Sequence, residues 1–289
     1  MSSPAGVIHD IGYQRYGGER LGRREVFLAL YTQSLRTVFG LGRNFKAKIF
    51  PWFVVGVAAI VAIVVMAIRA QTGEVILKYA EYPQVLSLLM VLFVAIAGPE
   101  LVSRDLHSGV LPLYFSRPLR PGDYALAKLA ALVSGVLLVF GGGQILIFIG
   151  AAFSVKGFGN VMNELADVGL ALIYTALYGL VFASIAVLVA SLLKRRAVAA
   201  AAIVGTFIVT TPIMAVLFIL PSETAHQLAQ MVNPATLVGG VGDWLFEPTN
   251  SQEEVGIGPF GPLYALVTVA LVALCVTLLV GRYRKVSKS

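Results

Sequence analysis

Six long apolar segments, separated by shorter polar stretches, constrain the fold of this 289-residue chain more than any other feature. An α-helix rises 1.5 Å per residue, so about 20 residues cross the roughly 30 Å hydrocarbon core of a bilayer. The six segments that approach or exceed this length are residues 49–68, 84–102, 124–153, 168–193, 198–220 and 262–281. Because 58% of the residues are hydrophobic and only 13% are charged, we predict an all-α integral membrane protein with six transmembrane helices.

The distribution of Lys and Arg predicts the orientation of these helices. With the N-terminus in the cytoplasm, nineteen of the 22 basic residues lie on the cytoplasmic side. The other three, Arg69, Lys78 and Lys156, face outward, and the connection 221–262 contains no Lys or Arg. We therefore expect both termini to be cytoplasmic in a multi-pass protein of the cell (cytoplasmic) membrane. The net charge of +7 reflects this topology, so we expect the lipid bilayer and no nucleic acid as a partner.

Composition and periodicity divide the chain further. We expect a cytoplasmic N-terminal arm at 1–22, an amphipathic interfacial helix within 23–47, a six-span domain at 48–281 and a cytoplasmic tail at 282–289. Within the six-span domain, 100–123 is a cytoplasmic loop and 221–262 an extracellular one. The interfacial helix is predicted from apolar residues at helical spacing opposite polar ones, namely Phe27, Tyr31, Leu35 and Val38 opposite Arg24, Thr32 and Arg36. The alternative is a plain extension of the first spanning helix.

Two other stretches leave their conformation open. In 221–262, a short helical stripe stops at Asn233-Pro234, which suits either a helix dipping into the membrane or a plain outer loop. In the third span, the triplet at 141–143 consists of three glycines, which weaken a helix locally and permit a kink or a close helix contact.

Motifs for catalysis and cofactor binding are missing from the sequence. It has no phosphate-binding loop of the Gly-x-x-x-x-Gly-Lys-Ser/Thr type, so any ATP must be handled by another subunit. His9, His107 and His226 are scattered, and the single Cys275 lies in the last apolar run, so we expect no metal site. We predict that the chain binds no cofactor and carries no catalytic residue.

The predicted spans contain few polar side chains at their centres and no charged ones, which disfavours an ion-coupled carrier. Tyr174 and Tyr178 share one helix face, and Thr206 and Thr210 share another. Together with Gln144, they are the candidate lining of a path for an apolar or amphipathic cargo. The alternative is that they serve only in packing and hydrogen bonding between helices.

The loop from Glu100 to Lys128 mixes charged residues with large apolar ones. The charges are those of Glu100, Arg104, Asp105, Arg117, Arg120, Asp123 and Lys128, and the apolar residues include Leu101, Leu106, Leu111, Leu113 and Phe115. Apolar side chains in a water-facing loop must rest on the bilayer surface or on another protein. Simpler roles are open for the charges: Arg117 and Arg120 as partners of lipid headgroups, and Glu100 as a partner of Arg104.

The architecture and this loop resemble the permease subunits of type 2 ABC exporters. The matching residues are Glu100, Gly109, Leu111, Ser116, Arg117, Pro118, Arg120, Tyr124 and Lys128, in the order typical of that family. Pro112 departs from the pattern, and it argues against a continuous helix from Gly109 to Phe115.

The resemblance implies that a short coupling helix between spans 2 and 3 sits in a cleft of a separate ABC ATPase. It implies two ATPase copies, which bind ATP and Mg²⁺, and a second permease, identical or related. The residues expected to couple to the ATPase are Glu100, Arg104, Asp105, Gly109, Leu111, Phe115, Arg117, Pro118 and Arg120. The alternatives are an ATP-independent secondary carrier and a membrane enzyme, and a drug, lipid, peptide or polysaccharide precursor all stay open as cargo.

Overall fold

The computed structural model describes residues 22–116, 118–155, 157–220, 222–246 and 257–287, and these ranges are helical with short connections. They contain six helical segments long and apolar enough to cross a membrane, which confirms the six predicted spans. The segments are Phe45–Thr72, Ser87–Ser108, Pro121–Ser154, Phe158–Leu192, Arg196–Ile219 and Gly258–Val286. Most of them extend past the predicted ends, because polar residues next to an apolar stretch can still form the backbone hydrogen bonds of the same helix.

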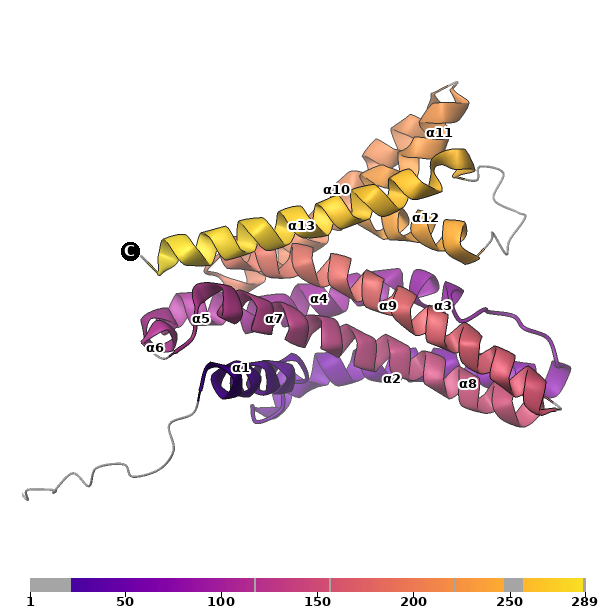
Figure 1. Ribbon diagram of the computed structural model, residues 1–289, viewed down its shortest axis with the longest axis horizontal. Helices are drawn as coiled ribbons and strands as arrows, with labels where there is room; N and C mark the ends of the chain where they lie inside the picture. Colours follow the sequence, from indigo (N-terminus) through magenta and orange to yellow (C-terminus); the bar gives the residue numbers. More distant parts are fainter. Residues whose placement is uncertain (1–21, 117, 156, 221, 247–256, 288–289) are drawn as a thin grey trace, which may run out of the picture.

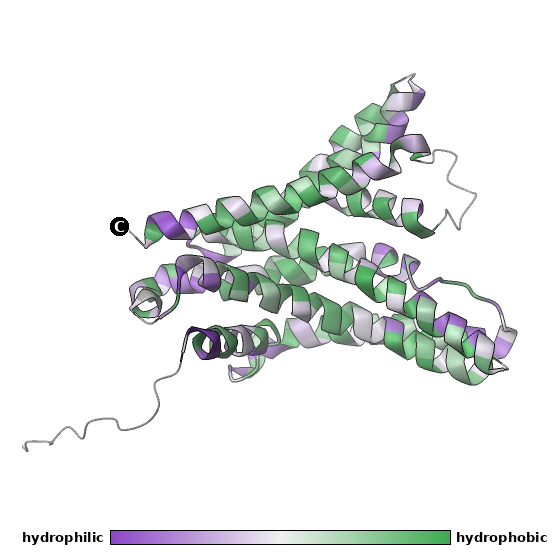
Figure 2. Ribbon diagram, viewed as in Figure 1, coloured by the Kyte–Doolittle hydropathy of each residue, from purple (hydrophilic) through white to green (hydrophobic). Residues whose placement is uncertain are grey.

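The long helices run roughly side by side along the longest axis of the molecule (Figure 1). One end, which we call the basic end, carries α1 (Arg23–Val38), α5 (Ser103–Ser108), α6 (Leu111–Phe115) and the C-terminal turn of α13 (Gly261–Val286). The opposite end, which we call the distal end, carries α3 (Glu81–Val85) and the junction between α8 and α9. Figure 2 shows hydrophilic residues gathered toward these ends and a hydrophobic middle, the pattern that a bilayer imposes.

Helix α1 is a separate element and not an extension of the first span. The chain turns at Gly40, whose φ of 66° is unfavourable for other residues, before α2 (Phe45–Thr72) begins. Arg24 and Arg36 are exposed on α1, as predicted. The opposite face packs against α7 (Pro121–Val136), where Tyr31 donates a hydrogen bond of 2.9 Å to Ser134. Part of the predicted apolar face is therefore covered by the protein itself, and the position of α1 at a membrane surface stays a prediction.

The third span is built from α7, a π-helical turn (η1, Leu137–Gly141) and α8 (Gly142–Ser154). The π turn immediately precedes the last two of the three glycines. A Cβ atom at Gly143 would lie 2.1 Å from the hydroxyl oxygen of Tyr82, which donates a hydrogen bond of 2.7 Å to Ala58 in α2. The glycines thus permit both effects considered for them, a helix irregularity and a close approach.

Helix α9 (Phe158–Leu192) lies at the centre of the bundle, against α4 (Ser87–Leu101), α7, α8, α10 (Arg196–Ile219) and α13. Its buried face is aromatic: the ring of Tyr178 lies 5.1 Å from Tyr174 and 5.5 Å from Phe182, which lies 4.7 Å from Phe207 of α10. The two Tyr178 contacts are edge-to-face and the Phe182–Phe207 contact is tilted, and such contacts add to the stabilisation from burying the rings. The helix starts at Phe158, ten residues before the predicted span at 168.

The predicted extracellular connection folds into a helical hairpin made of α11 (Glu223–Ala229), η2 (Gln230–Val232) and α12 (Pro234–Phe246). At its bend, the Asn233 amide donates hydrogen bonds of 3.1 Å to the Phe207 carbonyl and to Thr211. Phe207 lies about 18 Å along α10 from Ile219 at the distal end. The described part of this connection therefore reaches the middle of α10 and returns along α9 and α13 (Figure 1), which a plain outer loop does not do.

Candidate functional site

The loop singled out by the sequence forms a compact tip at the basic end, residues 103–116, which we call the α5–α6 tip. Gly109, with a φ of 65°, ends α5 in the left-handed conformation that favours glycine. Helix α6 then starts at Leu111, with Pro112 in its first turn, where a missing backbone N–H leaves no hydrogen bond unmade. The helix is therefore not continuous from Gly109 to Phe115, as predicted, but the break lies at Gly109 and Val110, and Pro112 itself lies within α6.

A buried ion pair joins the α5–α6 tip to the third span. The Lys128 ammonium lies 3.0 Å from the Asp105 carboxylate, which also accepts a hydrogen bond of 2.7 Å from the Tyr124 hydroxyl. Lys128 is only 6% exposed, and its Nζ atom lies 5.3 Å from the centroid of the Tyr124 ring. Buried charges are stable only when paired, so this pair fixes α5 against α7.

Three tyrosine rings connect α6 to the last span. The Tyr114 ring of α6 lies 5.5 Å from Tyr124 of α7, and the Tyr124 ring lies 4.9 Å from Tyr283 of α13. Tyr124 and Tyr283 are buried. These ring contacts pack α6 against α7, and α7 against α13.

Glu100, at the end of α4, connects further elements of the basic end. Its carboxylate accepts hydrogen bonds from Arg43, in the turn before α2, and from Arg196, the first residue of α10, at 2.6 Å. It therefore pairs across helices and not with Arg104, the nearby partner considered from sequence. On the surface, Arg23 of α1 binds the Asp123 carboxylate at 2.6 and 2.7 Å, and this hydrogen bonding raises the pKa of the Arg23 guanidinium.

The predicted coupling residues fall into two groups. Leu111 is 5% exposed and packs in the core of the chain, and Asp105 is engaged by Lys128. The residues exposed at the surface are Arg104, Gly109, Pro118 and Arg120, together with Leu113, which is 69% exposed. Arg117 and the side chain of Phe115 lie outside the described part of the structure. Within that part, Leu113 is the large apolar side chain of α6 that is available to a partner.

A second charged cluster, which sequence reasoning missed, lies near the distal end. Both terminal nitrogens of Arg69 in α2 donate to the Glu164 carboxylate of α9, which also accepts a hydrogen bond of 2.6 Å from Tyr79. Burial and the Glu164 hydrogen bond raise the pKa of Tyr79 well above its usual range. The signal available in the sequence was that Arg69 follows the first predicted span and Glu164 shortly precedes the fourth, so both lie near the outer ends of spans.

Gln144 belongs to the surroundings of this cluster. Its amide nitrogen donates a hydrogen bond of 2.8 Å to the Tyr79 carbonyl, and its amide oxygen accepts one of 3.0 Å from Thr175. Gln144 is fully buried, so its polar atoms serve contacts between α8, α9 and the segment before α3 in this structure.

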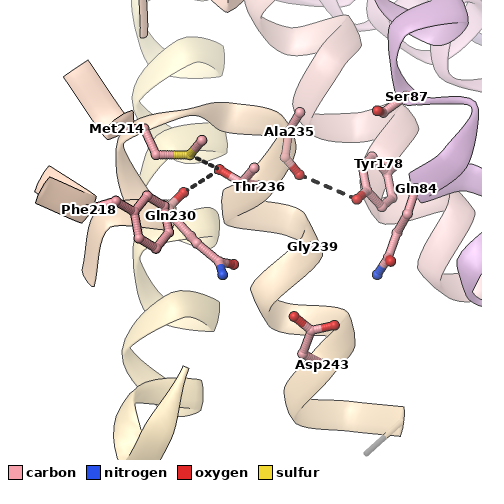
Figure 3. Close-up of a pocket in the computed structure, with 10 residues that line it drawn as sticks. All are labelled: Gln84, Ser87, Tyr178, Met214, Phe218, Gln230, Ala235, Thr236, Gly239 and Asp243. Carbon is pink, nitrogen blue, oxygen red and sulfur yellow. Dashed lines mark hydrogen bonds between the residues drawn. The ribbon is translucent and has the colours of Figure 1, made fainter. Parts of the chain in front are cut away.

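A pocket of about 430 Å³ lies between α4, α9, α10 and the hairpin (Figure 3). Its lining residues are Gln84, Ser87, Tyr178, Met214, Phe218, Gln230, Ala235, Thr236, Gly239 and Asp243. Tyr178 reaches the pocket and donates a hydrogen bond of 3.3 Å to the Ala235 carbonyl. Tyr174 lies behind it, where its hydroxyl accepts a hydrogen bond of 2.9 Å from Gln84 and donates one of 3.0 Å to Val238.

The other candidate cargo residues are not brought to this pocket. The Thr206 hydroxyl donates to the Ala202 carbonyl, and the Thr210 hydroxyl donates to carbonyls of its own helix. These bonds within α10 satisfy the hydroxyls on a helix that is largely uncovered. The structure thus joins Tyr178 with the hairpin, and not with Thr206 and Thr210.

Comparison with known proteins supports the resemblance seen in the loop. A search of curated proteins finds no match to the chain. The family model described as "ABC-2 family transporter protein" matches residues 65–280, which include the second to fifth spans completely and parts of the first and sixth. This stretch covers well over half of the chain and includes the α5–α6 tip, the pocket and the hairpin. The chain therefore belongs to the ABC-2 family of transporter proteins, as the membrane component of a transport system.

Proposed function

We propose that the chain is the permease subunit of an ATP-driven ABC exporter in the cell membrane, with ATP hydrolysed by a separate ATPase subunit. Two ATPase copies, which hold ATP and Mg²⁺, and a second permease, identical or related, complete the transporter. The chain itself supplies no catalytic residue and binds no cofactor. Membership of the ABC-2 family supports this proposal, because permeases of that family normally work with an ABC ATPase.

The observation that carries the proposal is the construction of the α5–α6 tip. Leu113 projects from it with 69% of its surface exposed, while Leu111, two residues earlier, is buried. Exposed Arg104 and Arg120 lie in the same loop. An apolar anchor with charged neighbours is the usual composition of a small protein interface, and it fits a cleft of the ATPase.

The contacts beneath the tip provide the mechanism. The Asp105–Lys128 pair joins α5 to α7, and the tyrosine rings join α6 to α7 and α13. When the ATPase subunits close on ATP, they displace the tip, and these contacts transmit the displacement to the third and sixth spans. Glu100 extends the connection to Arg196 at the start of the fifth span. Coupling therefore needs no flexible linker between the ATPase and the bundle.

The cargo in this proposal is apolar or amphipathic, a drug, a lipid or a similar molecule, and it moves out of the cell. The pocket supports this choice because apolar side chains such as Phe218 share its lining with polar ones such as Gln84. A strictly apolar cargo would need no such polar wall.

The test of the ATPase partner compares two leucines at the basic end. Leu113→Ala removes the exposed anchor of α6, and Leu28→Ala removes a leucine of α1 that is 48% exposed. A buried interface anchor contributes about 1 to 3 kcal/mol, so Leu113→Ala should weaken the affinity for the ATPase, seen as reduced co-purification, roughly 5- to 150-fold. It should also abolish cargo-stimulated ATP hydrolysis, while Leu28→Ala leaves both unchanged. Equal ATPase binding by the two variants would refute the role of α6, and cargo transport by the chain alone in ATP-free vesicles would indicate a secondary carrier.

The proposed orientation, with both termini in the cytoplasm, has its own test. In a background in which Cys275, the single cysteine, is replaced by Ala, new cysteines are placed at the exposed residues Ser222 and Ser287. Ser222→Cys should react with an impermeant thiol reagent in intact cells, and Ser287→Cys only after permeabilisation. The reverse pattern would invert the topology.

A further inference from the structure

The turn between α1 and α2 brings basic and apolar side chains together at one corner of the basic end. The Leu41 N–H donates a hydrogen bond of 2.8 Å to the Arg36 carbonyl, and a Cβ atom at Gly40 would lie only 2.5 Å from the Ala47 carbonyl oxygen. The turn is therefore tight, and it holds the end of α1 close to the first turn of α2. We call residues 36–53 the α1–α2 corner.

The charge of the α1–α2 corner is positive and mostly uncompensated. The corner contains four basic residues and no Asp or Glu. Arg43 is paired with Glu100, whereas Arg36, Lys46 and Lys48 take part in none of the ion pairs among the described residues. Arg36 and Lys46 are exposed, and Lys48 is half-buried. Three cations on one short stretch of surface attract an anionic partner.

A strip of large apolar side chains runs along α2 from the same corner. It consists of Phe45, Ile49, Trp52 and Phe53, each more than half exposed. The opposite face of α2 is buried against α8 and α4, so the strip faces away from the bundle. Because an α-helix turns by about 100° per residue, Lys46 and Lys48 lie on either side of this strip. The cations therefore flank an apolar surface that the chain itself leaves uncovered.

The direction of the two helices places these groups at different depths of a bilayer. Figure 1 shows α1 nearly end-on, whereas α2 and the other long helices run across the view. Helix α1 therefore lies across the direction of the spans, which is parallel to the plane of a membrane that α2 crosses. The cations of the corner then lie at the level of the lipid headgroups, and the strip enters the hydrocarbon below them.

We propose that the α1–α2 corner binds an anionic phospholipid, with its headgroup beside Arg36, Lys46 and Lys48 and an acyl chain along the strip. A soluble anion such as free phosphate would use the cations alone and would leave the strip without a role. Each Lys or Arg beside an anionic membrane surface strengthens binding about fivefold, so three are sufficient for a marked preference over a neutral lipid. The proposal goes beyond the exporter function, because it needs neither the cargo nor the ATPase.

The test reads lipid binding at Trp52, because the chain has two tryptophans and Trp244 lies on α12 of the hairpin. The full chain with Trp244→Phe is reconstituted in mixed bilayers of phosphatidylcholine and phosphatidylglycerol. In paired samples, one lipid or the other carries brominated acyl chains, which quench nearby tryptophan fluorescence. The quenching gives the relative affinity of the two lipids at Trp52, and we expect phosphatidylglycerol to bind at least about tenfold more tightly. The control chain with Trp52→Phe, in which Trp244 reports, should show nearly equal affinities.

Two triple variants of equal charge, made in the Trp244→Phe chain, test the location. The corner variant carries Arg36→Gln, Lys46→Gln and Lys48→Gln. The control variant removes three exposed charges elsewhere at the basic end and carries Lys194→Gln, Arg284→Gln and Lys285→Gln. The corner variant should reduce the lipid preference at Trp52 by about tenfold or more, and the control variant should retain it.

Three results would overturn the proposal. They are equal affinity of both lipids at Trp52, an unchanged preference in the corner variant, and an equal loss in both variants. If the corner variant kept its lipid preference but lost ATPase co-purification, the corner would be part of the ATPase interface instead. The ATPase is absent from the quenching assay, so a negative result there leaves the exporter function standing. Loss of ATPase binding in Leu113→Ala likewise leaves the lipid site standing.

Discussion

Replacing Asp105 by Asn removes the carboxylate that the described structure places 3.0 Å from the buried ammonium of Lys128. The side chains of Asp105 and Lys128 are 16% and 8% exposed, so water cannot take over the lost interaction. Breaking a buried pair from one side costs about 3 to 5 kcal/mol, because the other charge stays buried without a counterion. The contact of Lys128 with the Tyr124 ring is the same in both proteins and does not change this difference. We therefore expect a destabilisation of about 3 to 5 kcal/mol.

The assay uses Cys275, which is buried and is the single cysteine of the chain. Thermal unfolding in detergent exposes its thiol to a fluorogenic reagent, and the temperature of half-maximal labelling reports the Tm. Asp105→Asn should lower this Tm by roughly 5 °C or more. Lys128→Met should lower it less, since Asp105 keeps the Tyr124 hydrogen bond and lies nearer to water.

The double variant decides the physical interpretation. Asp105→Asn combined with Lys128→Met leaves no unpaired charge, so it should be more stable than Asp105→Asn alone. If Asp105→Asn melts at the wild-type temperature, or if the two effects add without coupling, then the pair does not fix α5 against α7. The proposed path from the α5–α6 tip into the bundle would then lose its main support.

Two further predictions use the same thermal assay. Glu100→Gln should lower the free energy of unfolding by about 1 to 2 kcal/mol, because it removes the charge that binds both Arg43 and Arg196. The control is Arg196→Ala, which removes a side chain that is 53% exposed. If both variants had the same Tm, the contact with Arg43 would contribute nothing. Tyr174→Phe should lower the free energy of unfolding by about 1 to 2 kcal/mol, because the hydroxyl loses hydrogen bonds of 2.9 and 3.0 Å. Tyr178→Phe loses one hydrogen bond of 3.3 Å, so it should lower stability less and should change cargo preference instead. If Tyr178→Phe had the lower Tm, Tyr174 would not be the packing tyrosine and Tyr178 the pocket tyrosine.

The loop between spans 2 and 3 shows how far local sequence patterns extend. Pro112 argued against a continuous helix from Gly109 to Phe115, and the helix is indeed interrupted. The break lies at Gly109, whose left-handed conformation ends α5, whereas Pro112 is tolerated in the first turn of α6. The residues that face a partner could not be assigned in the same way. Leu111 and Leu113 have the same chemistry, and only the packing of α6 against the bundle buries the first and exposes the second.

The charged groups show the same limit. Sequence spacing offered Arg104 as the partner of Glu100, since residues four apart on a helix are neighbours. The helix ends near Leu101, and the carboxylate meets Arg43 and Arg196 from other parts of the chain instead. Likewise, Arg69 and Glu164 are separated by 95 positions and pair only because the end of α2 lies near the start of α9. Pairings at such separations depend on the arrangement of helices, which no local pattern contains.

The sequence by itself determined that this protein is a bundle of six spanning helices, because a bilayer demands about 20 apolar residues per span and closes the backbone hydrogen bonds within each helix. It also carried the resemblance to ABC-2 permeases, which the family model confirms. Only the tertiary structure decided that the connection after the fifth span bends at Asn233 beside the middle of α10, and that Tyr178 and Asp243 share a pocket there. The physical reason is that hydropathy and backbone restrictions act within a helix, whereas a pocket is made by side chains from several helices whose relative positions are set by packing.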